Sequence, residues 1–181
     1  MANRNIVAIG ASAGGVEALR FLASKLPSDL HACVLIVIHL TTQFRSELDI
    51  ILSEVGPLPA TSARDGETLK DGHIFIAPAG FHLIVADDRL QLGIGQRENN
   101  ARPAIDPLFR SVALCCAPRA IGVVLMGTLG DGSSGLLALE QCGAITVVQD
   151  PRDARFAEMP TNAMARSNPK HVVSSRPCLN F

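Results

Sequence analysis

Short apolar runs alternate with amphipathic stretches along this chain. Residues 5–11, 32–40 and 121–126 form continuous apolar runs with many β-branched side chains, a pattern typical of strands buried on both faces of a sheet. Residues 14–27 carry apolar side chains at helical spacing, and Pro27 would end that helix. A strand, a helix and a second strand in this order predict a right-handed parallel crossover unit.

The rest of the chain repeats this alternation after a different middle part. Residues 57–95 hold short alternating runs, with a turn predicted at Asp87-Asp88, and we expect antiparallel strands there, at the sheet edge or as a flap. Further elements are predicted as helices over 46–53, 103–117 and 132–142, a strand over 144–149, a short helix from Pro160 and a strand over 171–174. The fold class is α/β: one domain over residues 1–181, with a doubly wound, mostly parallel sheet, an antiparallel hairpin insert at one edge and helices on both faces.

Composition narrows the class of protein. Hydrophobic residues make up 48% of the 181 residues and charged residues 18%, with a net charge of −1, which favours a compact globular domain and gives no reason to expect nucleic acid as a partner. We find neither an apolar run of membrane-spanning length nor a charged leader, so we expect no membrane insertion and a cytoplasmic protein. Five cysteines without a Cys-x-x-Cys pair predict neither a metal site nor disulfides. The pattern does not indicate an oligomeric state.

Three of the predicted strands stop at residues that a serine hydrolase needs. The first ends at Ser12, the second at His39, and the third just before Asp131. Because ligands bind outside the carboxyl ends of strands in open α/β sheets, a nucleophile, a base and a carboxylate at three such ends can converge. This convergence is the main functional prediction from the residues.

Each of these residues also has a plainer interpretation. Gly10 to Gly14 fits the Gly-x-Ser-x-Gly nucleophile elbow, but a glycine-rich turn from strand to helix is as often a phosphate cradle. His39 could be a core histidine instead of a general base, and Asp131 could cap the following helix. Asp106 is the rival carboxylate, although a position in the first turns of its helix explains it sufficiently. The polar loop over residues 96–102 is a candidate gate.

Several motifs in one order make the chain resemble the catalytic domain of the CheB family, the bacterial chemotaxis protein-glutamate methylesterases. The likeness covers nearly the whole chain. The motifs include residues 9–15 around Ser12, His39 after its apolar run, residues 72–78, residues 102–109, the glycine loop at 127–132 and residues 159–163.

The resemblance implies a serine esterase that removes methyl groups from γ-glutamyl methyl esters on the cytoplasmic helices of methyl-accepting chemoreceptors, and that deamidates receptor glutamines in many cases. It implies a triad of Ser12, His39 and Asp131, with Thr128 and Ala13 at the oxyanion. No cofactor and no metal ion are expected.

The chain departs from the family pattern at three positions: Ala13 replaces a common threonine or serine, Ile38 a common glutamine, and Leu129 a common glycine. Regulated members of the family carry a receiver domain ahead of the esterase, whereas this chain starts at its first strand, as a stand-alone esterase or an excised piece. Two other functions stay open: a catalytically weak CheB-like binding module, which Leu129 motivates, and a general carboxylesterase.

Overall fold

The computed structural model describes residues 4–39 and 47–174. Within these residues the chain forms a sheet of seven strands in the order β3-β4-β2-β1-β7-β8-β9, and every neighbouring pair is parallel. These strands are β1 (Ile6–Ala11), β2 (Cys33–Ile38), β3 (Ala60–Ser62), β4 (His73–Ile76), β7 (Ala120–Val124), β8 (Ile145–Gln149) and β9 (His171–Val173).

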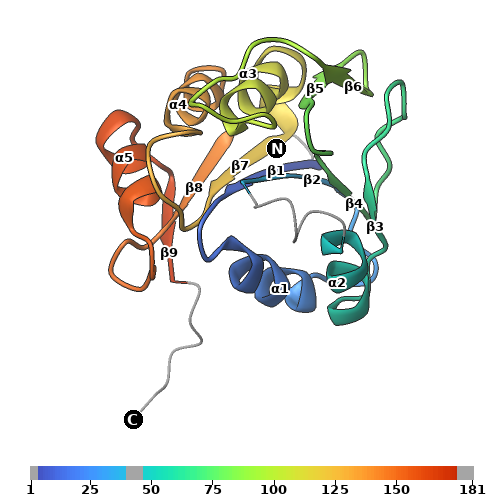
Figure 1. Ribbon diagram of the computed structural model, residues 1–181, viewed down its shortest axis with the longest axis horizontal. Helices are drawn as coiled ribbons and strands as arrows, with labels where there is room; N and C mark the ends of the chain where they lie inside the picture. The colour runs from blue at the N-terminus through green and yellow to red at the C-terminus, as the bar shows by residue number, and fades with distance from the viewer. Residues whose placement is uncertain (1–3, 40–46, 175–181) are drawn as a thin grey trace.

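Helices cover both faces of this sheet, as Figure 1 shows. On one face lie α1 (Gly15–Lys25) and α2 (Leu48–Val55), and on the other lie α3 (Ile105–Cys116) and α4 (Ser133–Gln141). A short 3₁₀ turn, η1 (Ala117–Arg119), follows α3, and α5 (Glu158–Arg166) packs against α4 and β8. The doubly wound, mostly parallel α/β fold predicted from the apolar runs is confirmed.

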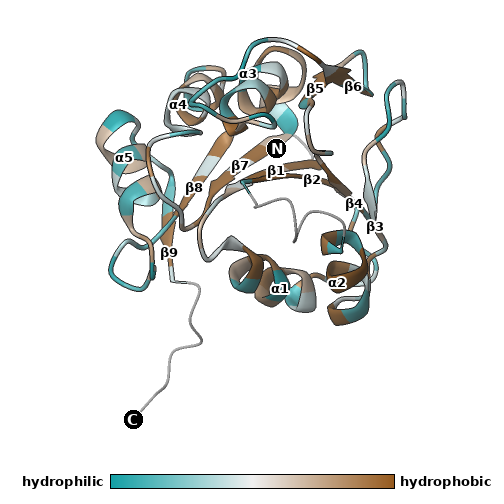
Figure 2. Cartoon of the chain, viewed as in Figure 1, coloured by the Kyte–Doolittle hydropathy of each residue, from teal (hydrophilic) through white to brown (hydrophobic). Residues whose placement is uncertain are grey.

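The central strands are apolar because they face helices on both sides (Figure 2). In β2 the alternate residues Cys33, Leu35 and Val37 join the core under α3 and α4, whereas Val34 and Ile36 join the core under α1 and α2. Burying both faces leaves no solvent side on which polar residues would recur, so the strand is a continuous apolar run. This central layer fixes the strand ends that position the candidate site.

The middle part of the chain divides between two sheets. The hairpin of β5 (His82–Ala86) and β6 (Arg89–Gly93) forms a separate two-stranded antiparallel sheet that packs on α3. Its turn is at Asp87 and Asp88, as predicted, and both have positive φ, at 50° and 56°. The expectation that residues 73–76 form an antiparallel strand was wrong. Strand β4 pairs in parallel with β2 and β3, because a connection long enough to cross the sheet precedes it.

Two smaller predictions also differ from the structure. Pro103 was predicted to open the third helix, but α3 begins at Ile105, with Ala104 extended at its N-cap. Apolar surroundings in the sequence predict that Cys33, Cys115, Cys116 and Cys142 are small buried side chains, but only Cys33 and Cys116 are buried, whereas Cys115 and Cys142 are exposed. A search of the described helices finds none long and apolar enough to cross a membrane.

Candidate active site

Ser12 lies in a tight turn between β1 and α1. The carbonyl of Ser12 accepts a hydrogen bond from Gly15 N at 2.8 Å, and Gly14 at the N-cap of α1 has a φ of 76°, which favours glycine. A Cβ on Gly15 would lie 2.7 Å from the Cβ of Ala11, so the turn also needs glycine there. The turn has the strand-to-helix form of the predicted nucleophile elbow.

His39 follows the neighbouring strand at the same height as Ser12. Ala11 of β1 is paired with Ile38 of β2, and His39 N donates to Ala11 O at 3.2 Å. Ser12 and His39 are therefore the residues that follow a paired position on two adjacent strands, so they lie side by side. Adjacent strands in a sheet are about 4.8 Å apart. Both side chains line one pocket of about 350 Å³. The Ser12 hydroxyl makes no hydrogen bond with any residue that the structure describes.

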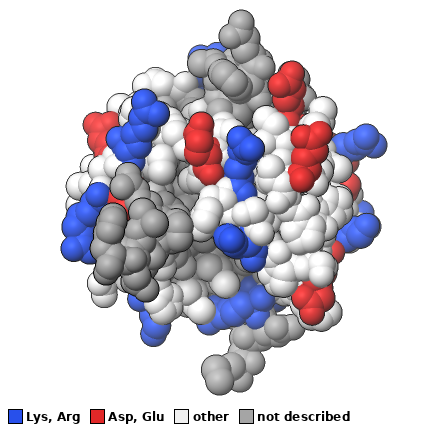
Figure 3. Space-filling model, turned by 90° about the horizontal axis from the view of Figure 1, so that it is seen from below, with Lys and Arg blue, Asp and Glu red and all other residues white. Residues whose placement is uncertain are grey.

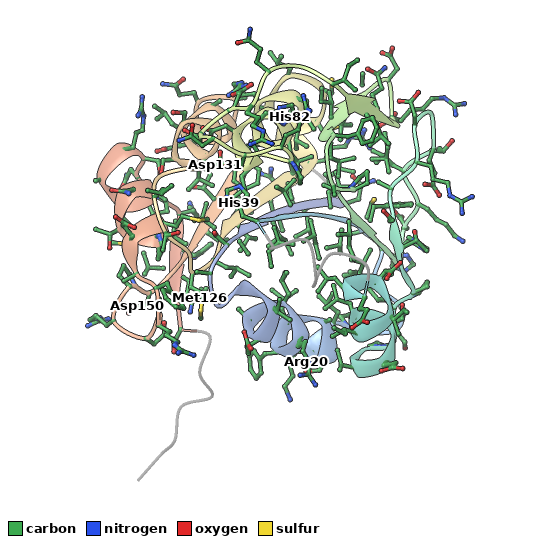
Figure 4. All side chains as sticks on the ribbon, in the orientation of Figure 1. Arg20, His39, His82, Met126, Asp131 and Asp150 are labelled. Atoms are coloured by element: carbon green, nitrogen blue, oxygen red, sulfur yellow. The ribbon has the colours of Figure 1, made fainter. Side chains whose placement is uncertain are left out.

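Asp131 is the carboxylate that contacts His39. Its Oδ2 lies 2.9 Å from His39 Nε2, and Asp131 itself is 1% exposed, so the contact is shielded from water (Figure 4). Backbone N–H groups surround the carboxylate: Ile105 N donates to Oδ2 at 2.6 Å, and Asp106 N donates to Oδ1 at 3.1 Å. Gly132 N also donates to Oδ1, at 2.9 Å. The first N–H groups of α3 thus bind Asp131.

These donors keep Asp131 ionised. Burial alone would raise the pKa of Asp131, but the hydrogen bonds from His39, Ile105 N and Asp106 N outweigh burial and lower its pKa below the usual value. Because an ionised carboxylate can only accept, Nε2 of His39 must carry the proton in this contact. The Nδ1 atom is then the ring nitrogen whose lone pair is left to accept a hydrogen bond.

Asp106 does not replace Asp131 as the partner of His39. Its Oδ1 accepts from Gly135 N at 2.7 Å, and its Oδ2 accepts from Asn99 Nδ2 at 3.0 Å. Burial raises the pKa of Asp106, and the adjacent charge of Asp131 raises it further, although the Gly135 N–H opposes them. Asp106 links α3 to the start of α4, which is a structural role.

The loop after β7 comes close to Ser12. A Cβ on Gly127 would lie 2.6 Å from the Cβ of Ser12, so only glycine fits where the two backbones meet. Gly127 N and Ser12 N are both occupied by backbone carbonyls. In contrast, Ala13 N and Thr128 N have no acceptor among the described residues, and Thr128 lines the pocket beside Ser12. These two N–H groups are available to bind a negative oxygen.

Leu129, which replaces the glycine common in the family, keeps the backbone conformation that a glycine would favour. Its φ is 66°, in the left-handed region that costs a residue with a Cβ about 1–2 kcal/mol. Two polar side chains hold it there: Leu129 N donates to Glu158 Oε2 at 2.8 Å, and Asn162 Nδ2 donates to Leu129 O at 2.8 Å. The leucine side chain is 58% exposed at the pocket rim.

Asn99 is a site residue that the sequence analysis missed. Its Nδ2 donates to Asp131 Oδ1 at 2.7 Å and to Asp106 Oδ2 at 3.0 Å, so one amide bridges both carboxylates. It lies in the 96–102 loop, whose gating role stays a prediction. The pair Asn99-Asn100 was the sequence signal for an unusual backbone path here, because asparagine adopts positive φ more readily than most residues other than glycine. In the structure φ is 49° at Asn99 and 61° at Asn100.

We predict that Asn99→Gly lowers kcat on a small ester about ten- to hundredfold, because a hydrogen bond to a charged group contributes about 1.5–3 kcal/mol. Glycine is chosen because it adopts the positive φ without strain. Asn100→Gly is the matched control, since Asn100 has the same backbone conformation and its side chain makes no hydrogen bond to a described residue. Equal losses in the two variants would show that Asn99 does not position Asp131.

The two buried histidines among the described residues, His73 and His82, have structural partners. His82 Nε2 lies 2.8 Å from Gln96 O, and Ala104 N donates to His82 Nδ1 at 3.2 Å, so both ring nitrogens are used. His73 contacts Thr61 Oγ1 at 2.8 Å, and burial followed by the charge of Lys70 lowers its pKa. Neither histidine lines the pocket that holds Ser12 and His39. In the described residues, no cluster of three or more His, Cys, Asp or Glu side chains could hold a metal ion.

Comparison with known proteins decides the family. The sequence profile of the CheB methylesterase family matches residues 7–177, which is nearly the whole chain. The chain belongs to the CheB methylesterase family. A crystal structure of the CheB methylesterase catalytic domain from Thermotoga maritima superposes with a TM-score of 0.90 and 27% identity, over 97% of this chain and 94% of that chain. The resemblance inferred from the motifs is confirmed, as is the expectation of a methylesterase-type enzyme.

The chain matches different shares of the length of its relatives. A relative from Leptospira interrogans is 33% identical over 95% of this chain and 90% of its own length. Protein-glutamate methylesterase/protein-glutamine glutaminase 1 from Xanthomonas euvesicatoria is 38% identical over 93% of this chain, and the protein-glutamate methylesterase/protein-glutamine glutaminase of Pectobacterium atrosepticum is 36% identical over 96%. The chain spans about half the length of these two proteins, at 48% and 50%.

Proposed function

We propose that this chain is a cytoplasmic serine esterase that hydrolyses γ-glutamyl methyl esters on chemoreceptor helices, with Ser12, His39 and Asp131 as its triad. The observation that carries the proposal is the 2.9 Å contact between the buried Asp131 and His39, which lines one pocket together with Ser12. Membership in the CheB methylesterase family supports the substrate class.

The first half of the reaction forms an acyl-enzyme. Ser12 Oγ attacks the ester carbonyl carbon while His39 Nδ1 accepts the hydroxyl proton, and Asp131 stabilises the resulting imidazolium. The carbonyl oxygen becomes an oxyanion and accepts hydrogen bonds from Ala13 N and Thr128 N. When the bond between the carbonyl carbon and the methoxy oxygen breaks, His39 donates its proton to the methoxy oxygen and methanol leaves.

The second half regenerates Ser12. Water attacks the acyl carbon, His39 accepts one water proton, and the proton then passes to Ser12 Oγ as the acyl bond breaks. The product is a glutamate side chain on the receptor. A receptor glutamine would form the same acyl-enzyme with loss of ammonia, so deamidation needs no additional residue.

Methanol release from a methylated chemoreceptor cytoplasmic fragment tests this proposal, with labelling by a fluorophosphonate as the second readout. We expect methanol and a label on Ser12. Turnover of small acyl esters without methanol from the receptor would instead indicate a general carboxylesterase. Receptor binding with neither turnover nor label would indicate a catalytically weak binding module.

A further inference from the structure

Two arginines form part of the pocket wall that faces Ser12 and His39. Arg97 and Arg102 both line this pocket and both come from the loop before α3. Among the described residues that line the pocket, none is an aspartate or a glutamate. The mouth of the proposed ester site is therefore positively charged.

The two arginines differ in how they are held. Arg102 Nη1 donates to Ile94 O at 3.2 Å and to Gly95 O at 2.8 Å, and its buried Nε has no partner in the described structure. This charge is fixed at the wall, and it is bound only by neutral carbonyls. Arg97 is exposed and makes no hydrogen bond or ion pair with a described residue, so its guanidinium is free to bind a ligand.

Nearby carboxylates are engaged elsewhere. Both oxygens of Glu98 pair with Arg110 at 2.7 Å, and Glu158 accepts the Leu129 N–H. Asp131 is buried behind His39. On the face of the molecule that includes α1, in contrast, acidic and basic side chains are interspersed (Figure 3). The positive charge at the pocket is consequently a local feature of the loop before α3.

A neutral methyl ester gains little from this charge, and the product carboxylate gains more. A positive rim therefore strengthens the binding of the ester substrate only if the substrate brings negative charge of its own. On a helix, residues three or four positions from the ester project from the same face, with about 5–6 Å between Cβ atoms. A helix is about 10 Å across, so only the ester side chain enters the pocket while its neighbours stay at the rim.

We propose that Arg97, supported by the fixed charge of Arg102, selects methyl esters flanked by carboxylate side chains one helical turn away. The inference rests on the proposed function and adds its sequence preference. Arginine suits this role because its planar guanidinium binds a carboxylate through two parallel hydrogen bonds.

Two helical peptides test the proposal, each with one glutamate methyl ester and with either glutamate or glutamine four residues away. Binding is measured with the Ser12→Ala variant, which holds the peptides without cleaving them. We expect the glutamate peptide to bind about three- to tenfold tighter, with the difference shrinking at high salt. In Arg97→Gln/Ser12→Ala the two affinities should converge. The control Arg20→Gln/Ser12→Ala removes an equal charge from α1 and should keep the difference (Figure 4).

Equal binding of the two peptides, or a preference that survives Arg97→Gln, would overturn the role of Arg97. The cleavage assay with wild-type protein is separate. A charge-dependent difference in binding without methanol release would support the arginine surface and count against the esterase proposal instead.

Discussion

Replacing Ser12 by alanine is expected to reduce methanol release to the background rate, a loss of at least about 10⁴-fold. The acyl-enzyme cannot form without the hydroxyl, and no other serine and no cysteine is among the described residues that line the pocket. Labelling by a fluorophosphonate should disappear together with turnover. The fold should remain, because the hydroxyl makes no hydrogen bond to a described residue.

Ser24→Ala is the matched control for this experiment. Ser24 is exposed on α1, and its hydroxyl donates to Phe21 O at 2.7 Å within the helix. We expect wild-type turnover and wild-type labelling from this variant. Methanol release that persists in Ser12→Ala would eliminate the proposed mechanism, whatever the control shows.

The second large effect is expected from Asp131→Asn, which should lower kcat about 10⁴-fold, as the corresponding change does in other serine triads. Both oxygens of Asp131 accept hydrogen bonds: Oδ2 from His39 Nε2 and Ile105 N, and Oδ1 from Asn99 Nδ2, Asp106 N and Gly132 N. An asparagine replaces one of these oxygens by an NH₂ group, which faces donors whichever way the amide is turned. His39 then loses the acceptor that fixes its tautomer. Turnover of a small ester measures the loss.

Asp106→Asn provides the comparison. An asparagine there can still accept from Gly135 N, and no contact with His39 is lost, so we expect about a tenfold loss at most. Circular dichroism checks that both variants fold. A loss in Asp106→Asn as large as that in Asp131→Asn would mean that the wrong carboxylate has been placed in the triad.

The arrangement of Ser12, His39 and Asp131 was predictable because all three follow apolar runs. A continuous apolar run identifies a strand buried on both faces, and parallel strands place their carboxyl ends at one edge. The order of strands then brings the residues together: β1 lies between β2 and β7, so the three loops are neighbours. No knowledge of side-chain contacts is needed for that inference.

The parts that could not be predicted depend on tertiary contacts of residues without local pattern. The role of Asn99 arises from its distance to two carboxylates that lie 7 and 32 positions away in sequence. The parallel pairing of His73–Ile76 was missed because a strand of four residues carries no signal for its direction. The positive φ of Leu129 was not predicted, since the two residues that hold its backbone, Glu158 and Asn162, belong to α5.

The use of main-chain donors around Asp131 has a consequence for how this protein tolerates mutation. Ile105 N and Asp106 N are present whatever side chains those positions carry, proline excepted. Evolutionary drift at these sites can therefore alter packing while the electrostatic support of the carboxylate persists. Divergent sequences can retain the same anionic centre on this scaffold for that reason.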